Sequence, residues 1–378
     1  MPTRSRFIDV AKGANILFVA FGHSHLIYVH PWIGSFNQSL LLFRMPFFFF
    51  LSGIFFEETK TFWRTLGEKT DALLKPYAAT LLLVLLKRAW FEEASLRELG
   101  PRVLYGIGET LGDPWTPLWY LPHLWLLSLF CLWLTRTTGF AGQRRALQGG
   151  LLALLLAGGT ASIQYWGSHP IYPPGRLAPF AGLPFSLDLV LLSAAFFLLG
   201  RALRTETLRF RPRLRWAGAL LALFLLVKCG LAPRLDFNLR IYAQPLAATV
   251  CALAGIYLAL TACHLLDRIP MLGRLLSAIG SLSLFILLFH AGIERLAYDW
   301  LPGQLGYGPG KFASLLAYTL SIGLPALLGL LIQRNDWVAL FYLPLRRNRT
   351  LAAIRWRDHL PAFASRSLPM RGASSRRL

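Results

Sequence analysis

The sequence has few charged residues, and it is poorest in acidic ones. Only 15% of its 378 residues are charged, and 18 Asp and Glu stand against 39 Lys and Arg, so the formal net charge is +21. Hydrophobic residues make up 55%, and the mean hydropathy is +0.49, which is more apolar surface than one soluble core can bury. The composition therefore indicates an integral membrane protein and disfavours a nucleic-acid partner, with the basic residues facing the cytoplasm and anionic membrane lipids.

Cysteine is scarce, and internal repeats are absent. No C-x-x-C pair occurs and no His stands at metal-ligand spacing, so the pattern predicts no metal site. No repeat period of about 20 to 50 residues is visible, which disfavours a solenoid and the paired halves typical of transporters. Small buried hydrophobic positions are expected for all four cysteines, which are Cys131, Cys229, Cys251 and Cys263.

Apolar runs that are long enough to cross a bilayer as helices, about 20 residues or somewhat fewer, recur along the chain. The ten predicted spans are 11–29, 39–56, 73–91, 117–135, 147–165, 186–203, 214–232, 242–265, 279–297 and 312–333. Lys and Arg concentrate in alternate loops, which by the positive-inside rule predicts that both termini are cytoplasmic. We therefore predict an all-α, multi-pass protein of the cell inner (plasma) membrane. Its transmembrane domain covers 1–340, and a basic, disordered or surface-bound tail covers 341–378.

The first span, "DVAKGANILFVAFGHSHL" (residues 9–26), carries polar groups that lipid penalises. At about 100° per residue, Lys12 and His23 lie roughly 20° apart around a helix, and Asp9 falls on the same stripe, whereas His25 points away by about 160°. Ionisable groups within a membrane usually face a bundle interior, where they mark a functional site. An interfacial ion pair with a snorkelling Lys12 explains Asp9 and Lys12 equally well. His23 suits a general base at physiological pH.

The second span, "LLFRMPFFFFLSGIFF" (residues 41–56), combines a Phe run with a helix distortion. The Phe run with Leu-Ser-Gly predicts a lipid-facing and helix-packing segment. Pro46 removes one helical donor, so Arg44 lies at a distortion, where its guanidinium could hold a phosphate or carboxylate. Snorkelling explains Arg44 about as well.

Four later polar or aromatic positions allow structural explanations. Trp119 fits an aromatic belt at the membrane interface, and His123 fits an interfacial histidine. A structural and a functional role are equally compatible with His290, and helix capping at the outer rim explains Asp188.

Together these stretches resemble the membrane-bound acyltransferase-3 family, particularly its branch of fucose 4-O-acetylase-like sugar acetyltransferases. The family signature, a basic residue followed by ten positions and His, is matched by Lys12 and His23. The second motif is matched at residues 43–46 and 48–53, although the branch usually carries His where this chain has Arg44. Weaker matches at 119–121 and 280–290 extend the resemblance over roughly residues 5 to 335.

The resemblance implies an acyl-CoA donor, usually acetyl-CoA, that arrives from the cytoplasm, and an acceptor hydroxyl on a sugar, polysaccharide or lipid-linked glycan. It implies that Lys12 helps place the donor phosphates and that His23 deprotonates the acceptor. Arg44 cannot act as a base at neutral pH, so it would stabilise an oxyanion or bind an anionic group. Direct transfer and a covalent acyl-His intermediate are both compatible with these residues. Further positions assigned to substrate binding are Asp9, His25, Ser52, Trp119, His123 and His290.

Two other classes of protein compete with the acyltransferase interpretation. A glycan flippase or small-solute transporter would also hold polar groups within a bundle, but such proteins often show paired halves or helices broken at corresponding positions. A purely structural membrane partner would not need Lys12, His23 and Arg44 together. The residues therefore favour an acyltransferase.

Overall fold

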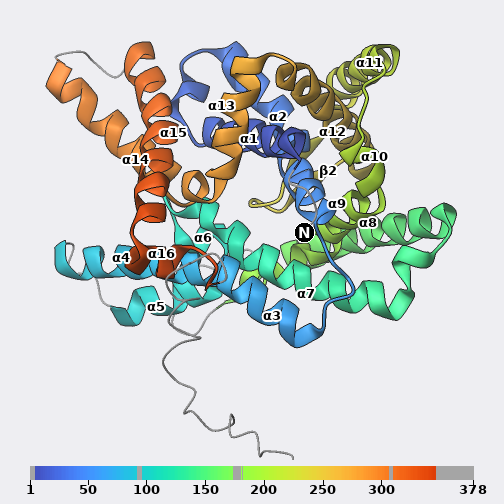
Figure 1. The fold of residues 1–378 in the computed structure, drawn as a ribbon, viewed down its shortest axis with the longest axis horizontal. Coiled ribbons are helices and arrows are strands. Elements are labelled where there is room, and N and C mark those ends of the chain that lie inside the picture. Colours follow the sequence, from blue (N-terminus) through green and yellow to red (C-terminus); the bar gives the residue numbers. More distant parts are fainter. Residues whose placement is uncertain (1–4, 92–95, 173–179, 181, 306–309, 346–378) are drawn as a thin grey trace, which may run out of the picture.

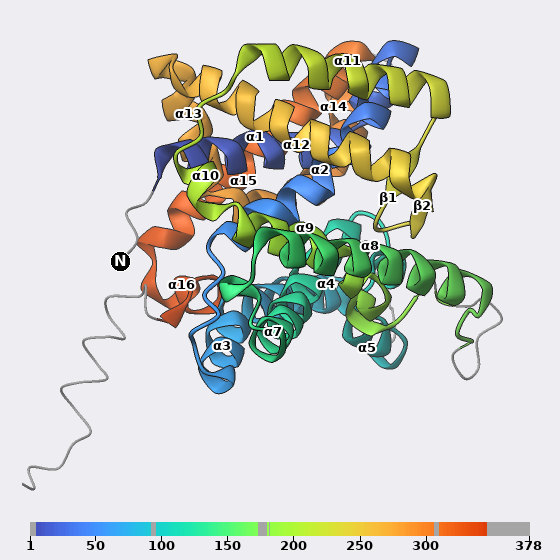
Figure 2. The same cartoon turned by 90° about the vertical axis from the view of Figure 1, so that its right-hand side faces the viewer.

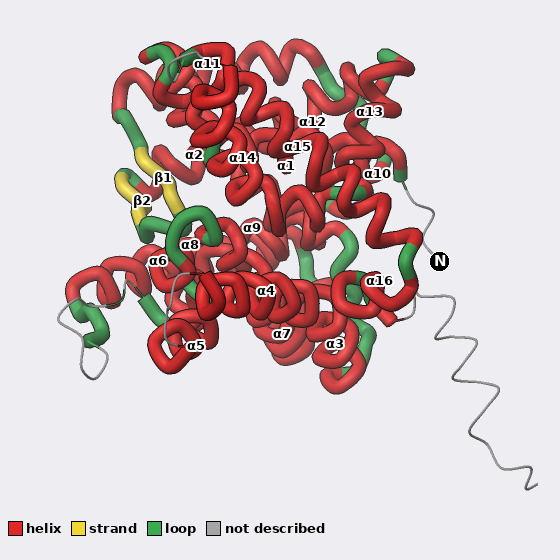
Figure 3. Tube along the Cα trace, turned by 90° about the vertical axis from the view of Figure 1, so that its left-hand side faces the viewer, coloured by secondary structure: helices red, strands yellow, loops and turns green. Residues whose placement is uncertain are grey.

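The computed structural model describes residues 5–91, 96–172, 180, 182–305 and 310–345. Helices dominate it (Figure 3). The α-helices are α1 (Arg6–Gly22), α2 (Pro31–Ile54), α3 (Phe62–Lys69), α4 (Lys75–Phe91), α5 (Leu96–Tyr105), α6 (Gly108–Leu111), α7 (Tyr120–Thr138), α8 (Arg145–Ser168), α9 (Val190–Ala202), α10 (Arg204–Leu208), α11 (Leu214–Leu231), α12 (Pro245–Asp267), α13 (Pro270–Ser281), α14 (Ser283–Leu305), α15 (Lys311–Arg334) and α16 (Asp336–Tyr342). Of the predicted tail, 341–378, the first two residues belong to α16, which ends at Tyr342, and the part from residue 346 onward lies outside the described residues.

Short elements join these helices. The 3₁₀ turns are His25–Tyr28, Thr116–Trp119, Phe140–Gly142 and Pro184–Leu189, and a π turn covers Thr70–Leu74. Within the described ranges the only sheet is an antiparallel hairpin of β1 (Arg234–Asp236) and β2 (Ile241–Ala243). The chain is thus almost entirely helical, as predicted, apart from this hairpin.

Each of the ten predicted spans overlaps a helix. Six helices in the described ranges are long and apolar enough to cross a membrane, and a seventh span results if α13 and α14, which meet at 82°, count as one. The multi-pass membrane character agrees with the prediction. Ten spans and their orientation remain predictions.

Helix α11 shows why the protein needs a lipid environment. Only 6% of its apolar 18-residue window is buried, and Leu226 is 72% exposed. In water such a face would be an unusually large apolar patch, whereas lipid solvates it. Cys229 lies on this helix and is exposed, so its predicted burial was wrong, while the other three cysteines are buried.

Two predictions about loops and helix ends need correction. The predicted outer loop between α11 and α12 carries Arg234 and Arg240, so basic residues do not alternate along every loop. The first span was predicted to continue to residue 29, but α1 ends at Gly22 and His23 is its C-cap. The cause is tertiary, because the His25 backbone N–H donates to the Glu294 carboxylate, 2.7 Å away on α14, instead of to a helical carbonyl.

Helix α1 lies inside the bundle and packs against α13, α2, α12, α14 and α15 (Figure 1). The hairpin β1–β2 lies between the group formed by α11 and α12 and the group that contains α8 (Figure 2). The N-terminal polar helix and the hairpin are therefore both held within the helical framework.

The Phe run of α2 packs inside the protein, so its predicted lipid-facing part was wrong. Phe47, Phe49 and Phe50 are at most 1% exposed. The run is buried because α2 crosses α9 at two glycines, as packing of small residues allows. A Cβ on Gly53 would lie 1.8 Å from the Phe197 carbonyl oxygen, and one on Gly200 would lie 2.0 Å from the Phe50 carbonyl oxygen.

Replacing Gly53 with alanine is expected to lower the free energy of unfolding by about 1–3 kcal/mol, because the added methyl collides with backbone rather than with a flexible side chain. Thermal unfolding of the detergent-solubilised protein measures the effect. Gly218→Ala on α11 is the matched control, since nothing lies within 4 Å of its added Cβ. Equal melting temperatures for the two variants would contradict the close crossing of α2 and α9.

Candidate active site

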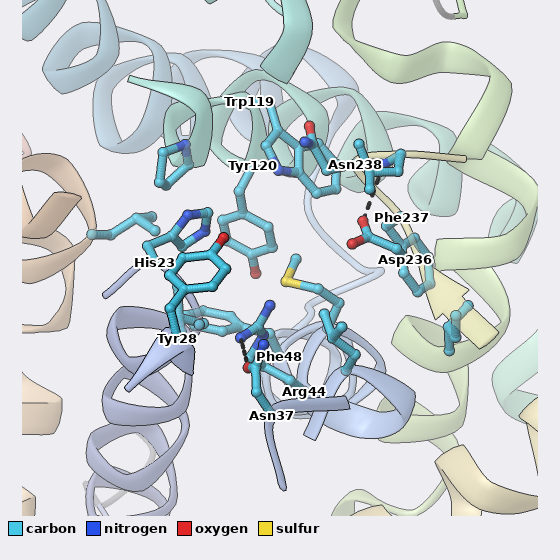
Figure 4. Close-up of a pocket in the computed structure, with 18 residues that line it drawn as sticks. His23, Tyr28, Asn37, Arg44, Phe48, Trp119, Tyr120, Asp236, Phe237 and Asn238 are labelled. Carbon is cyan, nitrogen blue, oxygen red and sulfur yellow. Dashed lines mark hydrogen bonds between the residues drawn. The ribbon is translucent and has the colours of Figure 1, made fainter. Parts of the chain in front are cut away.

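A cavity of ≈ 280 Å³, here called the central cavity, lies where α1, α2, the turn before α7 and the hairpin meet. Three predicted site residues line it, namely His23, Arg44 and Trp119. Figure 4 shows His23, Arg44 and Tyr120 around one open space, with Asp236 on the far side. The fold thus brings His23 of the first motif and Arg44 of the second into one cavity.

His23 presents its imidazole to the central cavity. As the C-cap of α1, it stands where the helix stops, and its side chain is solvent-accessible because it borders the cavity. No hydrogen bond joins its ring to another described residue. Both ring nitrogens are therefore available to a ligand, as a general base requires.

His290, on α14, lies edge-on to His23, with the ring centroids 5.5 Å apart. Its Nδ1 donates to the carbonyl oxygen of Ile286 at 2.8 Å. A carbonyl can only accept, so in the neutral ring the proton is on Nδ1, and Nε2 is an acceptor. Nε2 is buried and has no hydrogen-bond partner among the described residues. His290 therefore holds an unpartnered hydrogen-bond acceptor close to His23.

Arg44 is 7% exposed and extends from α2 toward the end of α1. Its Nη1 donates to the carbonyl oxygen of Phe18 at 3.1 Å and to Asn37 Oδ1 at 3.5 Å, and its Nε is buried without a partner in the described parts of the chain. A Cβ on Gly22 would lie 1.7 Å from Nη1. The guanidinium of Arg44 can therefore lie next to His23 only because residue 22 is a glycine.

Asp9, Lys12 and Ser52 line a second cavity of ≈ 550 Å³, here called the Lys12 cavity. The Lys12 ammonium lies 4.8 Å from the centre of the Phe55 ring, within cation–π range. Ser283, at the break between α13 and α14, also lines this cavity. Asp9 and Lys12 thus lie in a different chamber from His23, although all three belong to one helix and its cap.

Three residues line both cavities and form the wall between them: Phe48, Tyr120 and Leu287. The rings of Phe48 and Tyr120 are 4.7 Å apart. The Tyr120 hydroxyl and Ser52 Oγ are hydrogen-bonded at 3.0 Å. The two cavities therefore adjoin at these three side chains.

Three of the four predicted site histidines line neither cavity, and His290 is one of them, although its ring contacts that of His23. His25 Nδ1 donates to the buried Glu294 carboxylate at 3.0 Å, and its ring stacks on Tyr298 at 3.6 Å. His123 is fully buried within the protein, with Nε2 2.7 Å from Ser193 Oγ. Across the described residues, no three His, Cys, Asp or Glu side chains gather as a metal site.

Several polar residues of the central cavity escaped the sequence-based prediction. Asn37 is a partner of Arg44, while Asp236 and Asn238 line the cavity from the hairpin. The signal available for the hairpin is the alternation of "LDFNL" at residues 235–239, which is strand-like and lies between two apolar spans. Its shortness makes it easily read as an ordinary loop.

Comparison with known proteins supplies the family. Residues 5–334 match the acyltransferase-3 model, which is described as an acyltransferase domain. No curated protein gives a significant match. The matched range contains both cavities and every residue that lines them. The chain therefore belongs to the acyltransferase-3 family and is a membrane acyltransferase.

Proposed function

We propose that this protein transfers an acyl group, most simply acetyl, from acyl-CoA to a hydroxyl of a sugar, polysaccharide or lipid-linked glycan. The observation that carries the proposal is a pair of adjoining cavities with three lining residues in common, with His23 and Arg44 in one and Lys12 in the other. A transferase needs two substrates held on either side of a reacting centre. The family membership supports acyl transfer as the reaction.

In this proposal the donor occupies the Lys12 cavity, and its thioester reaches the wall at Phe48 and Tyr120. His23 takes the proton of the acceptor hydroxyl as the hydroxyl oxygen attacks the thioester carbonyl carbon. The C–S bond then breaks, and the CoA thiolate leaves with the proton returned by His23. Arg44 stabilises the negative charge that develops on the carbonyl oxygen, as preorganised donors do. A covalent route would place the acyl group on His23 before the acceptor attacks.

The proposed topology has ten membrane segments, with both termini in the cytoplasm and the protein in the inner membrane. Acetyl-CoA would then enter as a co-substrate from the side of the N-terminus. The position of Lys12 near the start of α1 supports this arrangement, because the phosphates of CoA remain near water while the thioester extends inward.

Incubating membranes that contain the full chain with ¹⁴C-acetyl-CoA tests this proposal. Label is expected in the glycan fraction as a base-labile ester, and none is expected with membranes that lack the protein. Incubating the purified protein in detergent with ¹⁴C-acetyl-CoA and no acceptor separates the two routes, since label that stays on the protein after rapid gel filtration at neutral pH indicates the covalent one. Glycan movement across vesicles with no acetyl ester would instead support the flippase interpretation.

A further inference from the structure

The hairpin β1–β2 forms one wall of the central cavity, opposite Arg44. Asp236, Phe237 and Asn238 at its tip line the cavity, and Figure 4 shows the Asp236 carboxylate and the Asn238 carboxamide at its border, with Asn238 beside Trp119. Asn238 Oδ1 is buried and has no hydrogen-bond partner within the described ranges. That oxygen packs against Gly108, where an added Cβ would lie 1.8 Å from it, so the amide nitrogen is the polar group that Asn238 can offer to a ligand in the cavity.

Buried interactions hold the hairpin in place. Arg240 Nε lies 3.1 Å from Asp188 Oδ2, and their side chains are 8% and 0% exposed. Asp188 Oδ1 also accepts from the backbone N–H of Leu183 at 2.8 Å. Removal of one partner from a buried pair is strongly destabilising. The pair therefore anchors the hairpin to the segment before α9.

The tip itself is also ordered. Asp236 Oδ1 accepts from the backbone N–H of Leu239 at 3.0 Å, which closes the turn. Phe237 is 2% exposed, and its ring lies 5.3 Å from that of Phe49 in the core. The polar side chains of the tip are therefore held at the cavity rather than on a mobile loop, as a recognition site requires.

The charges of the cavity point to a neutral ligand. Its lining contains one permanently cationic group, Arg44, and one carboxylate, Asp236, and the two attract each other. Their charges cancel, so the cavity offers no net attraction to an anion. The Asp236 carboxylate accepts hydrogen bonds from hydroxyls, the Asn238 amide N–H groups donate to hydroxyl oxygens, and Trp119 supplies an apolar face. At ≈ 280 Å³ the cavity is near the lower limit of ligand sites, about 300 Å³.

We propose that Asp236 and Asn238 recognise the acceptor, and that the acceptor group in the central cavity is a single uncharged, polyhydroxylated sugar unit. This inference rests on the proposed acyl transfer and adds to it the residues and the charge class of the acceptor. It assigns the hairpin the role of selecting neutral sugars over uronic acids.

The test uses the full chain in detergent with ¹⁴C-acetyl-CoA and a matched pair of acceptors, p-nitrophenyl β-D-glucopyranoside and p-nitrophenyl β-D-glucuronide. The wild-type protein is expected to acetylate the glucoside with a kcat/KM at least about tenfold higher than its kcat/KM for the glucuronide. Asp236→Asn keeps the Oδ1 acceptor of the turn but removes the charge. It is expected to raise the KM for the glucoside about tenfold, to leave the KM for acetyl-CoA unchanged, and to narrow the preference over the glucuronide.

Arg234→Ala is the control, because Arg234 is an exposed hairpin residue that does not line the cavity. Three outcomes would overturn the inference. The first is an unchanged KM for the glucoside in Asp236→Asn, and the second is a wild-type protein that acetylates the glucuronide as well as or better than the glucoside. The third is acetylation of neither pyranoside while membrane glycan is labelled. All three outcomes leave the proposed function intact. Absence of acetyl transfer to any acceptor, membrane glycan included, refutes the proposed function itself.

Discussion

Replacing His23 with alanine is expected to lower the initial rate of acetyl transfer by about 10²–10⁴-fold, the range that a lost general base produces. The imidazole borders the central cavity, and none of the described residues hydrogen-bonds its ring. No other imidazole lines that cavity within the described residues. The measurement is the rate of ¹⁴C-ester formation at saturating acetyl-CoA.

The matched control is His169→Ala, because His169 is exposed at the end of α8 and lines neither cavity. His23→Gln separates hydrogen bonding from proton transfer, since an amide can still bind a hydroxyl but cannot accept its proton. We expect it to be as inactive as the alanine variant. A His23→Ala protein that keeps a tenth or more of the wild-type rate would remove His23 from the mechanism.

Removing the Arg44 guanidinium is expected to lower kcat by about 10²–10³-fold, as loss of an oxyanion donor does. Arg44→Lys keeps the charge but lacks the planar guanidinium group and its unpartnered Nε, so we expect a smaller decrease in kcat than in Arg44→Ala. Single-turnover rates report the chemical step directly. A wild-type kcat in Arg44→Ala would exclude a role in stabilising the transition state.

Gly22→Ala tests the position of Arg44 without changing the arginine. The added methyl would lie 1.7 Å from Nη1, so the guanidinium must move away from the His23 turn. We expect a lower kcat and little change in the KM for acetyl-CoA, because the Lys12 cavity is not touched. Gly218→Ala serves again as the control that adds a methyl in open space.

Sequence alone predicted the elements and the main polar residues of the site. In lipid, an apolar run must satisfy its own backbone hydrogen bonds, so each long run predicts a helix. Lys12, His23 and Arg44 stand out because ionisable groups within such runs are costly. Their spacing and order along the chain also carried the family resemblance.

Other features depended on contacts between residues far apart in the chain. The end of α1 at Gly22 depends on Glu294 of α14, and the burial of the Phe run depends on a glycine of α9. Neither partner can be assigned from hydrophobic periodicity, which reports which face is apolar but not which helix covers it.

The division of the site into two chambers was likewise decided only by tertiary structure. Helical geometry places Asp9, Lys12 and His23 on one stripe, yet the two ends of that stripe line different cavities, with Phe48 and Tyr120 in the wall between them. The hairpin reaches the same space because a buried ion pair anchors it. The sequence thus determined which side chains lipid could not accept, and the packing of distant segments determined which of them meet, because cavities form between elements rather than within them.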